Sequence, residues 1–585
     1  MDGHREVDMK NGLRAVLAVA VCGVACAGSA LGATRIVSVY VESFAELQKQ
    51  AALGAGAFQA PMLAALPMMM TGGLPGAAQM DNSKPVAMHL LALDGGETGM
   101  VIEVAPSAAP EAYLKALAGG EAEGALPEPK DGIYTLGKHM AAKVAGGRLY
   151  IVTHAKKQAA LLGTDLTAYS ELPTLPGVLR VSVEPQAVVP YLKKATASIP
   201  VQVNAPDAEK QRRAVERALG FYSGMLEQLK ALHLGLNIQN EGVFVRSRLI
   251  PRAGSDLAAL MLSGKPVSTK QQAFLKKDSL FSYASGGSTV PKTLENALIE
   301  MYTELVASSP MYTGGATNDW AAVLKQSIAL WGVPQALAVS RPVPDGALHV
   351  QGCWQMDDPV GYLESQFAMM KEPFFVTMMK QSGIKFPGPT KRTVDDMKVY
   401  DWKMEFDEQA MEKTVRAAFP PDLPAEKADA AVAAHQQTFR TLKVLLGDGY
   451  TYATSGKDLI LAMGGEAVLA DAVKRAKASA GASAEADRIE ALLSPSADPH
   501  SIGSIALARI IALSLAARPE TADIAKGIPD SEGIVFAGWP FKGETLSAML
   551  IPTSEIKAIT AAAMAGQAAA RKRNAPARPP VPDNF

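Results

Sequence analysis

The sequence predicts an α+β fold: two tandem, related units of antiparallel β-hairpins backed by helices, after an N-terminal signal peptide. Three observations predict it. Four segments of the 585-residue chain recur later in the chain in the same order, and the longest matched segment changes from strand-like alternation to helical periodicity. The N-terminus has the pattern of a secretory signal.

The first 33 residues contain the three parts of a bacterial secretory signal. Lys10 and Arg14 supply positive charge, an apolar stretch follows, and small residues precede a cleavage site that we place after Ala33. We therefore expect a periplasmic or secreted protein with no transmembrane segment after cleavage. A retained membrane anchor is one alternative. Lipid attachment at Cys26 is another, although Gly23 stands where a larger aliphatic residue is expected.

Composition narrows the functions that the mature chain can have. Only Cys353 remains after cleavage, so no intrachain disulfide can form. The net charge of −1 lacks the basic footprint that nucleic acid binding requires, and we expect no nucleic acid partner. The segment 566–585 contains Arg571, Lys572 and Arg573 among several prolines, which predicts a disordered, basic, Pro-rich tail.

The strongest internal match joins residues 85–114 to residues 334–363 at a constant shift of 334 − 85 = 249. It places Val101 on Val350 and Tyr113 on Tyr362. Both segments are predicted to form strand, turn, strand and helix. In the second segment Asp357 or Asp358 is expected to cap the helix, with Pro359 in its first turn.

Three further matches follow in the same order along the chain. They pair 67–73 with 310–315, 145–151 with 454–461, and 243–251 with 544–552. Four matches in one order predict a duplication. We place the first unit at 34–270 and the second at 278–565, with a helical insertion at about 407–446.

The first unit is also predicted to contain an extra helix at 207–232. Val215, Leu219, Tyr222, Leu226 and Leu229 recur there at the spacing of a buried helical face.

This order of elements resembles that of uncharacterised exported bacterial proteins built from a duplicated hairpin-and-helix α+β unit. The resemblance covers nearly all the mature chain but depends on short strings. It implies no activity and assigns no functional residue.

Motifs for catalysis, phosphate binding and metal binding do not occur in their complete form. The segment 455–458 has Asp458 where a phosphate-binding loop needs Ser or Thr, so we interpret it as a hairpin turn. There is no Gly-x-Ser-x-Gly, and the mature histidines are not at metal-motif spacing. We therefore expect no cofactor, and we assign no catalytic residue and no metal ligand.

One stretch is unusual because residues 50–80 contain no charged side chain and several methionines. Methionine side chains repack easily around varied partners, which favours an adaptable binding surface. The alternative is a buried helix followed by a loop that covers the core. The candidate surface consists of Met62, Met68, Met69, Met70, Thr71, Gly72 and Gly73, with the related Met311, Tyr312, Thr313, Gly314 and Gly315.

These observations favour an exported, non-catalytic envelope protein that binds a polypeptide, a lipid or another apolar ligand. Two alternatives stay open. One is an exported hydrolase whose site is not visible as a motif, and the other is a structural or assembly subunit. The pattern predicts no oligomeric state.

Overall fold

A computed structural model describes residues 34–574 except for short internal segments. These segments are 59–61, 73, 94–96, 119–125, 137–138, 155–156, 164–174, 198–207, 309–316, 342–345, 373–374, 377–378, 380–382, 386, 418–423, 448, 479–482 and 517–520. The predicted signal peptide and the last eleven residues (585 − 574 = 11) lie outside the described residues.

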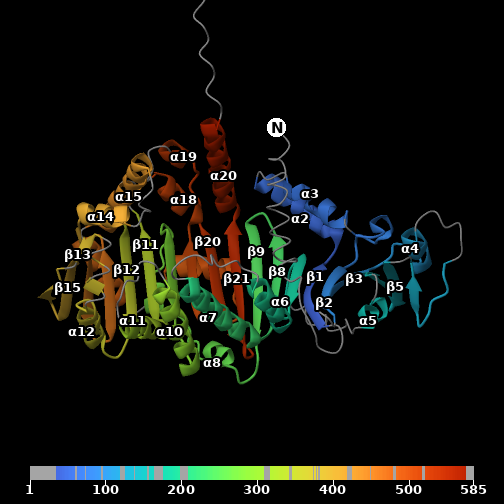
Figure 1. The fold of residues 1–585 in the computed structure, drawn as a ribbon, viewed down its shortest axis with the longest axis horizontal. Coiled ribbons are helices and arrows are strands. Elements are labelled where there is room, and N and C mark those ends of the chain that lie inside the picture. The colour runs from blue at the N-terminus through green and yellow to red at the C-terminus, as the bar shows by residue number, and fades with distance from the viewer. Residues whose placement is uncertain are drawn as a thin grey trace, which may run out of the picture.

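Nineteen of the strands form one sheet in which every pairing is antiparallel (Figure 1). The strands of the first run are β1 (Thr34–Val41), β2 (Val86–Ala92), β3 (Thr98–Val104), β4 (Ile133–Thr135), β5 (Met140–Ala145), β6 (Arg148–Thr153), β7 (Leu179–Val183), β8 (Leu229–Ile238) and β9 (Gly242–Pro251). Those of the second run are β10 (Phe281–Ser285), β11 (Gln335–Ser340), β12 (His349–Gln355), β14 (Pro389–Val394), β15 (Met397–Lys403), β17 (Gly449–Ser455), β18 (Asp458–Met463), β19 (Ser501–Ile505), β20 (Ile534–Phe541) and β21 (Glu544–Pro552). A separate ribbon joins β13 (Ile384–Lys385) to β16 (Glu405–Phe406).

The order of the strands across the sheet is similar in the two runs. The first run has the order β4-β5-β6-β3-β2-β1-β7-β8-β9. The second has the order β14-β15-β17-β18-β12-β11-β10-β19-β20-β21. The last strands of the two runs, β9 and β21, pair with each other. We call this pairing the seam, and it joins both runs into a single sheet.

Helices pack against both faces of the sheet. Those of the first run are α2 (Phe44–Ala57), α3 (Met62–Thr71), α4 (Pro110–Leu117), α5 (Gln158–Leu162), α6 (Pro185–Ala197), α7 (Ala208–Glu227), α8 (Asp256–Leu262) and α9 (Thr269–Gln272), with the 3₁₀ turn η1 (Ala77–Gln79). Those of the second run are α10 (Lys292–Ala307), α11 (Thr317–Trp331), α12 (Pro359–Met369), α14 (Glu408–Ala417), α15 (Ala425–Leu446), α16 (Glu466–Ala476), α17 (Ala484–Leu493), α18 (Leu507–Ala516), α19 (Ala522–Lys526) and α20 (Thr553–Asn574).

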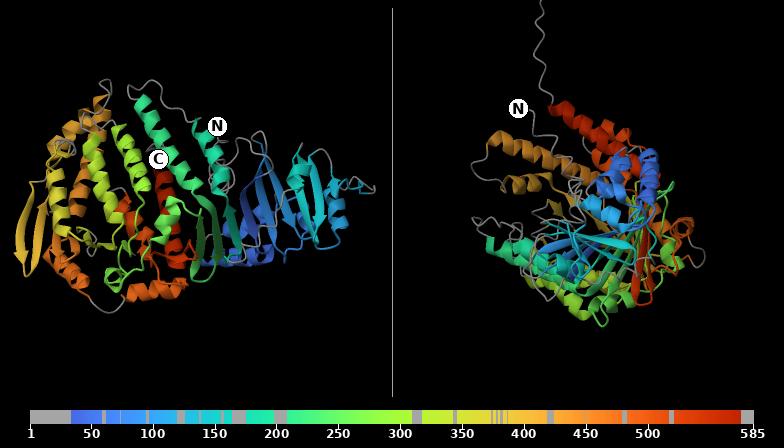
Figure 2. Two further views of the ribbon diagram at one scale, coloured as in Figure 1. Left: turned by 90° about the horizontal axis from the view of Figure 1, so that it is seen from below. Right: turned by 90° about the vertical axis from the view of Figure 1, so that its right-hand side faces the viewer.

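Different helices lie at the two ends of the central strands. In Figure 1, α2, α3 and α20 lie at the upper end, and α6, α7, α8 and α10 lie at the lower end. Figure 2 (left) shows α6, α7, α10 and α11 side by side in one layer. The largest buried cluster lies on the opposite face of the second run, where Val468 of α16 and Ile489 of α17 pack over Ala336 and Ile460.

Several predicted features are confirmed. The fold is a mixture of helices and a large antiparallel sheet. Asp358 caps α12 by accepting a hydrogen bond from the N–H of Gly361 at 2.8 Å, and Pro359 is the first helical residue. Ser455 and Asp458 pair across a tight turn, so 455–458 is a hairpin turn as predicted. The helices α14 and α15 occupy 408–417 and 425–446, in the stretch where a helical insertion was expected.

Two predicted boundaries are wrong. The helix expected at 207–232 ends at Glu227, because Leu229 begins strand β8. Residues 566–574, expected in the disordered tail, belong to the alanine-rich α20, which continues to Asn574. In the described part of the chain, no helix is both long enough and apolar enough to span a membrane.

Candidate functional site

The eight central strands, from β1 to β10 across the β9–β21 seam, have two different faces. On one face the side chains are buried, as at Ser282 and Ala284 of β10. On the other face most of the alternate apolar residues from β8 to β10 are only half-buried, whereas Val37 and Val41 of β1 and Ile238 of β8 are buried. We call this second side the uncharged face. Its half-buried apolar residues include Leu234, Leu236, Val245, Met549, Phe536 and Tyr283. At the β1 and β7 end of this face, helix α6 covers the sheet, and Val39 and Val181 pack beside Tyr191.

The register of the strands aligns these side chains. Leu236 pairs with Val245, Val245 with Met549, and Met549 with Phe536. Directly paired residues point to the same side of a sheet, so these residues form one row. At about 4.8 Å between strands, the five spacings from β8 to β10 extend over about 24 Å.

Aromatic rings extend the row into the second run. The ring of Phe536 lies over Gly503, where a Cβ atom would come within 2.7 Å of it. The rings of Phe536 and Tyr283 stack with their centroids 6.4 Å apart. A side chain at position 503 would therefore displace Phe536, and glycine keeps this part of the face flat.

The uncharged face is named for its composition. Among its paired positions in the described part of the eight central strands there is no Asp, Glu, Lys, Arg or His side chain, and the exposed Lys230 is the unpaired bulge residue at the beginning of β8. The opposite face of the same strands is charged. Arg248 there donates to Glu544 through Nε at 2.5 Å and through Nη2 at 3.0 Å, and Arg180 is also buried on that side.

Polar groups occur on the uncharged face only as hydroxyls and a few other neutral groups. At the seam, the Oγ atoms of Ser247 and Ser547 lie 2.5 Å apart. Both serines are half-buried. Ser501 of β19 and Ser285 of β10 continue this line of hydroxyls beside the apolar row.

The predicted methionine surface is only partly described. Met68 and Met69 are exposed to 76% and 52%, whereas Met70 is half-buried against the core of the first run. The segment forms the helix α3, and Pro67 lies inside it. Thr71 closes the last turn by donating to the carbonyl of Pro67 at 3.0 Å.

The remaining predicted residues flank the methionines on α3 or lie outside the described residues. Met62 begins α3, and Gly72 follows it. Gly73 and the related residues Met311, Tyr312, Thr313, Gly314 and Gly315 lie outside the described residues.

A buried polar cluster on the charged side of the sheet was missed by the sequence analysis. Nδ1 of His89 lies 3.2 Å from Oγ of Ser38, and Nε2 of His89 lies 3.7 Å from Glu103. Glu103 also pairs with Arg148 at 2.6 Å. Burial lowers the pKa of His89, and Glu103 opposes this shift only in part, so the imidazole is neutral at neutral pH. In the sequence, this cluster could have been indicated by the run Val37-Ser38-Val39, in which a serine lies between β-branched residues of a strand.

Ser282 on β10 is the second-run counterpart of Ser38 on β1, but the residues around it differ. Ser38 faces Ser182 on one side and His89 on the other. Ser282 faces Ser504, with its Oγ 2.8 Å away, but Ala338 on the other side. The second run therefore has the serine pair without the histidine.

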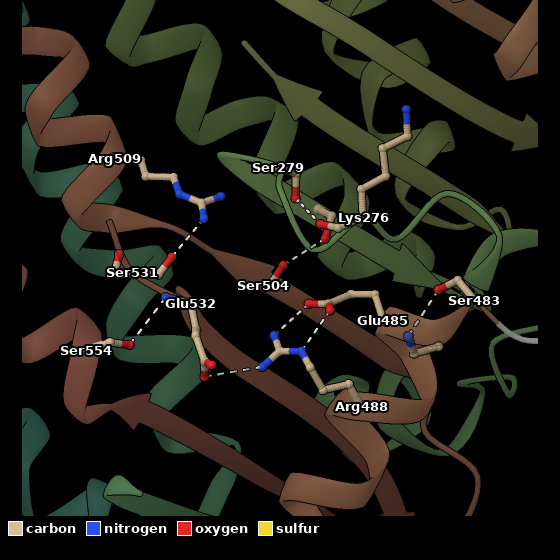
Figure 3. A network of polar contacts seen from close by, with 12 residues as sticks. Lys276, Ser279, Ser483, Glu485, Arg488, Ser504, Arg509, Ser531, Glu532 and Ser554 are labelled. Carbon is tan, nitrogen blue, oxygen red and sulfur yellow. Dashed lines mark hydrogen bonds and ion pairs between the residues drawn. The ribbon is translucent and has the colours of Figure 1, made fainter. Parts of the chain in front are cut away.

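Other polar groups in the second run connect helices and loops to the sheet. Figure 3 shows Arg488 between Glu485, which it contacts at 2.7 Å, and Glu532. Asp471 accepts hydrogen bonds from Gln351 and Lys276. Every donor here already has an acceptor within the fold, which indicates a structural role.

A groove of about 540 Å³ separates α7 from α10. Its walls have both signs of charge, and Arg217 and Glu300 form an ion pair between the two helices. It indicates no particular ligand.

Metal and thiol chemistry have little support in the described residues. No group of three or more His, Cys, Asp or Glu side chains there is placed to hold a metal ion. Cys353 is fully buried, and burial raises the pKa of its thiol to about 12.

Comparison with known proteins gave no relative for this chain. No protein-family model matches it, and neither a curated protein nor a solved structure matched it in the searches.

Proposed function

We propose that the protein is an exported, non-catalytic binding protein of the cell envelope that holds an apolar ligand against the uncharged face. The observation that supports this is the row of half-buried apolar side chains through Leu236, Val245, Met549 and Phe536. Apolar area left in contact with water costs about 25 cal/mol per Å² relative to burial. A ligand that covers the row removes this cost.

We also propose that the chain arose by duplication and that the seam is the centre of the binding face. The shared strand order of the two runs supports this. The alignment of residues 85–114 with residues 334–363 has to shift by one residue at the second strand. His89 pairs with Val101, but Ala338 pairs with Gln351, so Val101 corresponds to Gln351 rather than to Val350. An experimental structure in which the two runs do not superpose on this register would contradict the duplication.

We propose that the exposed methionines of α3 contribute to ligand binding at the border of the uncharged face. Helix α2 packs against β8 of the binding face, and α3 packs against α2. Met68 and Met69 point away from the core of the first run. We propose that they border the face and contact a ligand as it enters.

Binding of an uncharged fluorescent probe, N-phenyl-1-naphthylamine, tests the proposal directly. Fluorescence titration of the purified protein should show saturable binding. Met549→Gln and Leu234→Gln, on the uncharged face, should each weaken it about tenfold, because each introduces an amide that the probe cannot hydrogen-bond. Met564→Gln is the matched control, since Met564 is 55% exposed on α20.

The proposal is wrong if the probe does not bind, or if the control weakens binding as much as the two variants on the face. Circular dichroism and a urea titration of each variant separate loss of binding from loss of folding.

Hydrolysis is the second candidate function, and the line Ser38–His89–Glu103 supports it. A neutral imidazole beside a hydroxyl is the arrangement that activates a serine. Against it, Ser38 and His89 are both fully buried, so a substrate would have to open the sheet. Hydrolysis of p-nitrophenyl butyrate that is lost in Ser38→Ala but kept in Ser282→Ala would favour this candidate.

A further inference from the structure

The helical hairpin α2–α3, at the upper end of the molecule in Figure 1, exposes an apolar surface. From Gln50 to Met80 the chain has no Asp, Glu, Lys, Arg or His. The exposed residues in the described part of this stretch are only Ala, Gly, Leu and Met, and they include Leu53 at 37%, Met68 at 76% and Met69 at 52%. Helices that face water normally expose charged residues, so this surface is typical of an interaction site.

Helix α20 adds positive charge at the same end. It projects beyond the other described helices there (Figure 1; Figure 2, right). Residues 558–570 of α20 have no charge, and Met564 among them is 55% exposed. The next three residues, Arg571, Lys572 and Arg573, are all basic and lie in the last turn of the helix. Exposed methionines and three consecutive basic residues therefore occur at one end of the molecule.

A lipid bilayer that contains anionic lipids is complementary to both features. Its interfacial region accepts apolar side chains, and its phosphate groups attract Lys and Arg close to the surface. Helix α3 has ten residues, and a helix that spans a bilayer needs about 20, so α3 would lie at the surface. A second copy of the chain would also cover the methionines, but a twofold contact through this end brings two groups of basic residues to one interface, where they repel.

We infer that the protein attaches to the surface of an anionic bilayer through this end, with Met68 and Met69 of α3 among the lipids and the basic end of α20 at the phosphates. This inference goes beyond the proposed function and does not depend on the uncharged face. The two are compatible, because an apolar ligand held in the bilayer would meet the protein at α3, which is proposed to border that face.

Cosedimentation with lipid vesicles tests the attachment. The protein is the chain beginning at Thr34, which excludes the apolar stretch of the predicted signal. Vesicles of phosphatidylcholine alone are compared with vesicles that also contain about 30% phosphatidylglycerol. We expect binding to the anionic vesicles, and we expect it to weaken when the salt concentration is raised from about 0.1 M to about 0.5 M.

Two variants separate the charged contribution from the apolar one. The triple variant Arg571→Gln, Lys572→Gln and Arg573→Gln should weaken binding to anionic vesicles about a hundredfold, at about fivefold for each basic residue. The double variant Met68→Ser with Met69→Ser should weaken it about tenfold, because less apolar area enters the bilayer. Circular dichroism checks that both variants keep the fold.

The lower end of the molecule supplies matched controls. Leu262→Ser removes an apolar side chain that is 64% exposed on α8. The triple variant Lys210→Gln, Arg213→Gln and Lys292→Gln makes the same change of charge at exposed positions of α7 and α10. Both controls should bind anionic vesicles as well as the parent does.

A fluorescent reporter shows which end enters the bilayer. Relative to the parent chain, the added fluorescence of Met68→Trp should be quenched by lipids with brominated acyl chains. The added fluorescence of Leu262→Trp should not be quenched.

Several outcomes would overturn the attachment. They are no cosedimentation with anionic vesicles, equal weakening by the variants of the two ends, and equal quenching at positions 68 and 262. A dimer that is lost in the Met68→Ser and Met69→Ser double variant, without vesicle binding by the parent, would assign the surface to a second copy. Probe binding to the uncharged face is measured without vesicles, so failure of the proposed function is seen separately.

Discussion

The carboxylate of Glu555 accepts a hydrogen bond from the backbone N–H of Ala508 at 2.8 Å, in a fully buried space where α18 and α20 meet. Ser531 donates to the second oxygen of the same carboxylate. Glu555 thus ties the first turn of α20 to the beginning of α18, where backbone N–H groups lack partners within the helix.

Glu555→Ala should destabilise the protein by about 2–4 kcal/mol, because it leaves the Ala508 N–H and the Ser531 hydroxyl buried without an acceptor. Glu555→Gln keeps one acceptor oxygen and should cost less. Urea unfolding measures both, and hydrogen exchange should show the loss of protection concentrated in α18 and α20. Equal stability of Glu555→Ala and the parent would contradict this role.

The histidine cluster predicts a dependence of stability on pH. Burial holds the pKa of His89 below the value of about 6.5 that it has in an unfolded chain. The unfolded state therefore binds a proton that the folded state does not. The free energy of unfolding should fall as the pH is lowered from 7 toward 5, by up to about 1.4 kcal/mol per pH unit.

Urea titrations at pH 7 and pH 5.5 check this dependence. His89→Gln should show a smaller difference between the two pH values than the parent, whatever its absolute stability. His500 retains its own contribution, because burial lowers the pKa of its imidazole too. His435→Gln, at an exposed residue of α15, is the control variant. The idea fails if His89→Gln keeps the full difference.

The methionines of α3 are predicted to differ in what they contribute to stability. The double variant Met68→Ser with Met69→Ser should change the free energy of unfolding by less than about 1 kcal/mol, because both side chains are largely exposed. Met301→Ser, at 1% exposure on α10, should cost about 2–5 kcal/mol. A large loss in the double variant would show that Met68 and Met69 have a structural role.

The network at Asp471 predicts resistance to acid in the second run. Burial alone would raise its pKa, but hydrogen bonds from Gln351, Arg475 and Lys276 lower the pKa of Asp471 to about 2. The stabilisation is complete above about pH 4, where the unfolded aspartate is ionised, and is lost as the pH falls toward 2.

Asp471→Asn should therefore destabilise the protein at pH 7 but change its stability less at pH 2.5, as measured by thermal unfolding. Asp395→Asn, in the exposed turn between β14 and β15, is the matched control. An equal loss at both pH values would contradict the assignment.

Local features of this chain were predictable because they depend on a few neighbouring residues. The hairpin turn at 455–458 and the cap at Asp358 follow from turn and capping chemistry within four residues. The antiparallel hairpins follow from short connections between alternating segments. The repeated segments also indicated that similar hairpins recur in the same order along the chain.

The orientation of faces was not predictable, because it depends on which distant element packs on each face. In α7 the face expected to be buried contains Val215 and Tyr222, which are 37% and 56% exposed. The helix instead turns Ala218, Phe221 and Met225 toward α10, an element that is distant in the sequence. Periodicity shows that a helix has an apolar face, but two faces of similar apolarity compete in α7.

By itself, the sequence determined which segments become strands and helices in the α+β fold, because turn residues and apolar periodicity act locally. Only the tertiary structure decided that β9 pairs with β21, that Ser247 meets Ser547 across 300 residues, and that one face of the sheet stays uncharged and half-buried. Strand pairing uses backbone hydrogen bonds that are the same for every residue, so the sequence of a strand does not name its distant partner. The partner is selected by the packing of the whole chain, and the candidate binding face exists only after that selection.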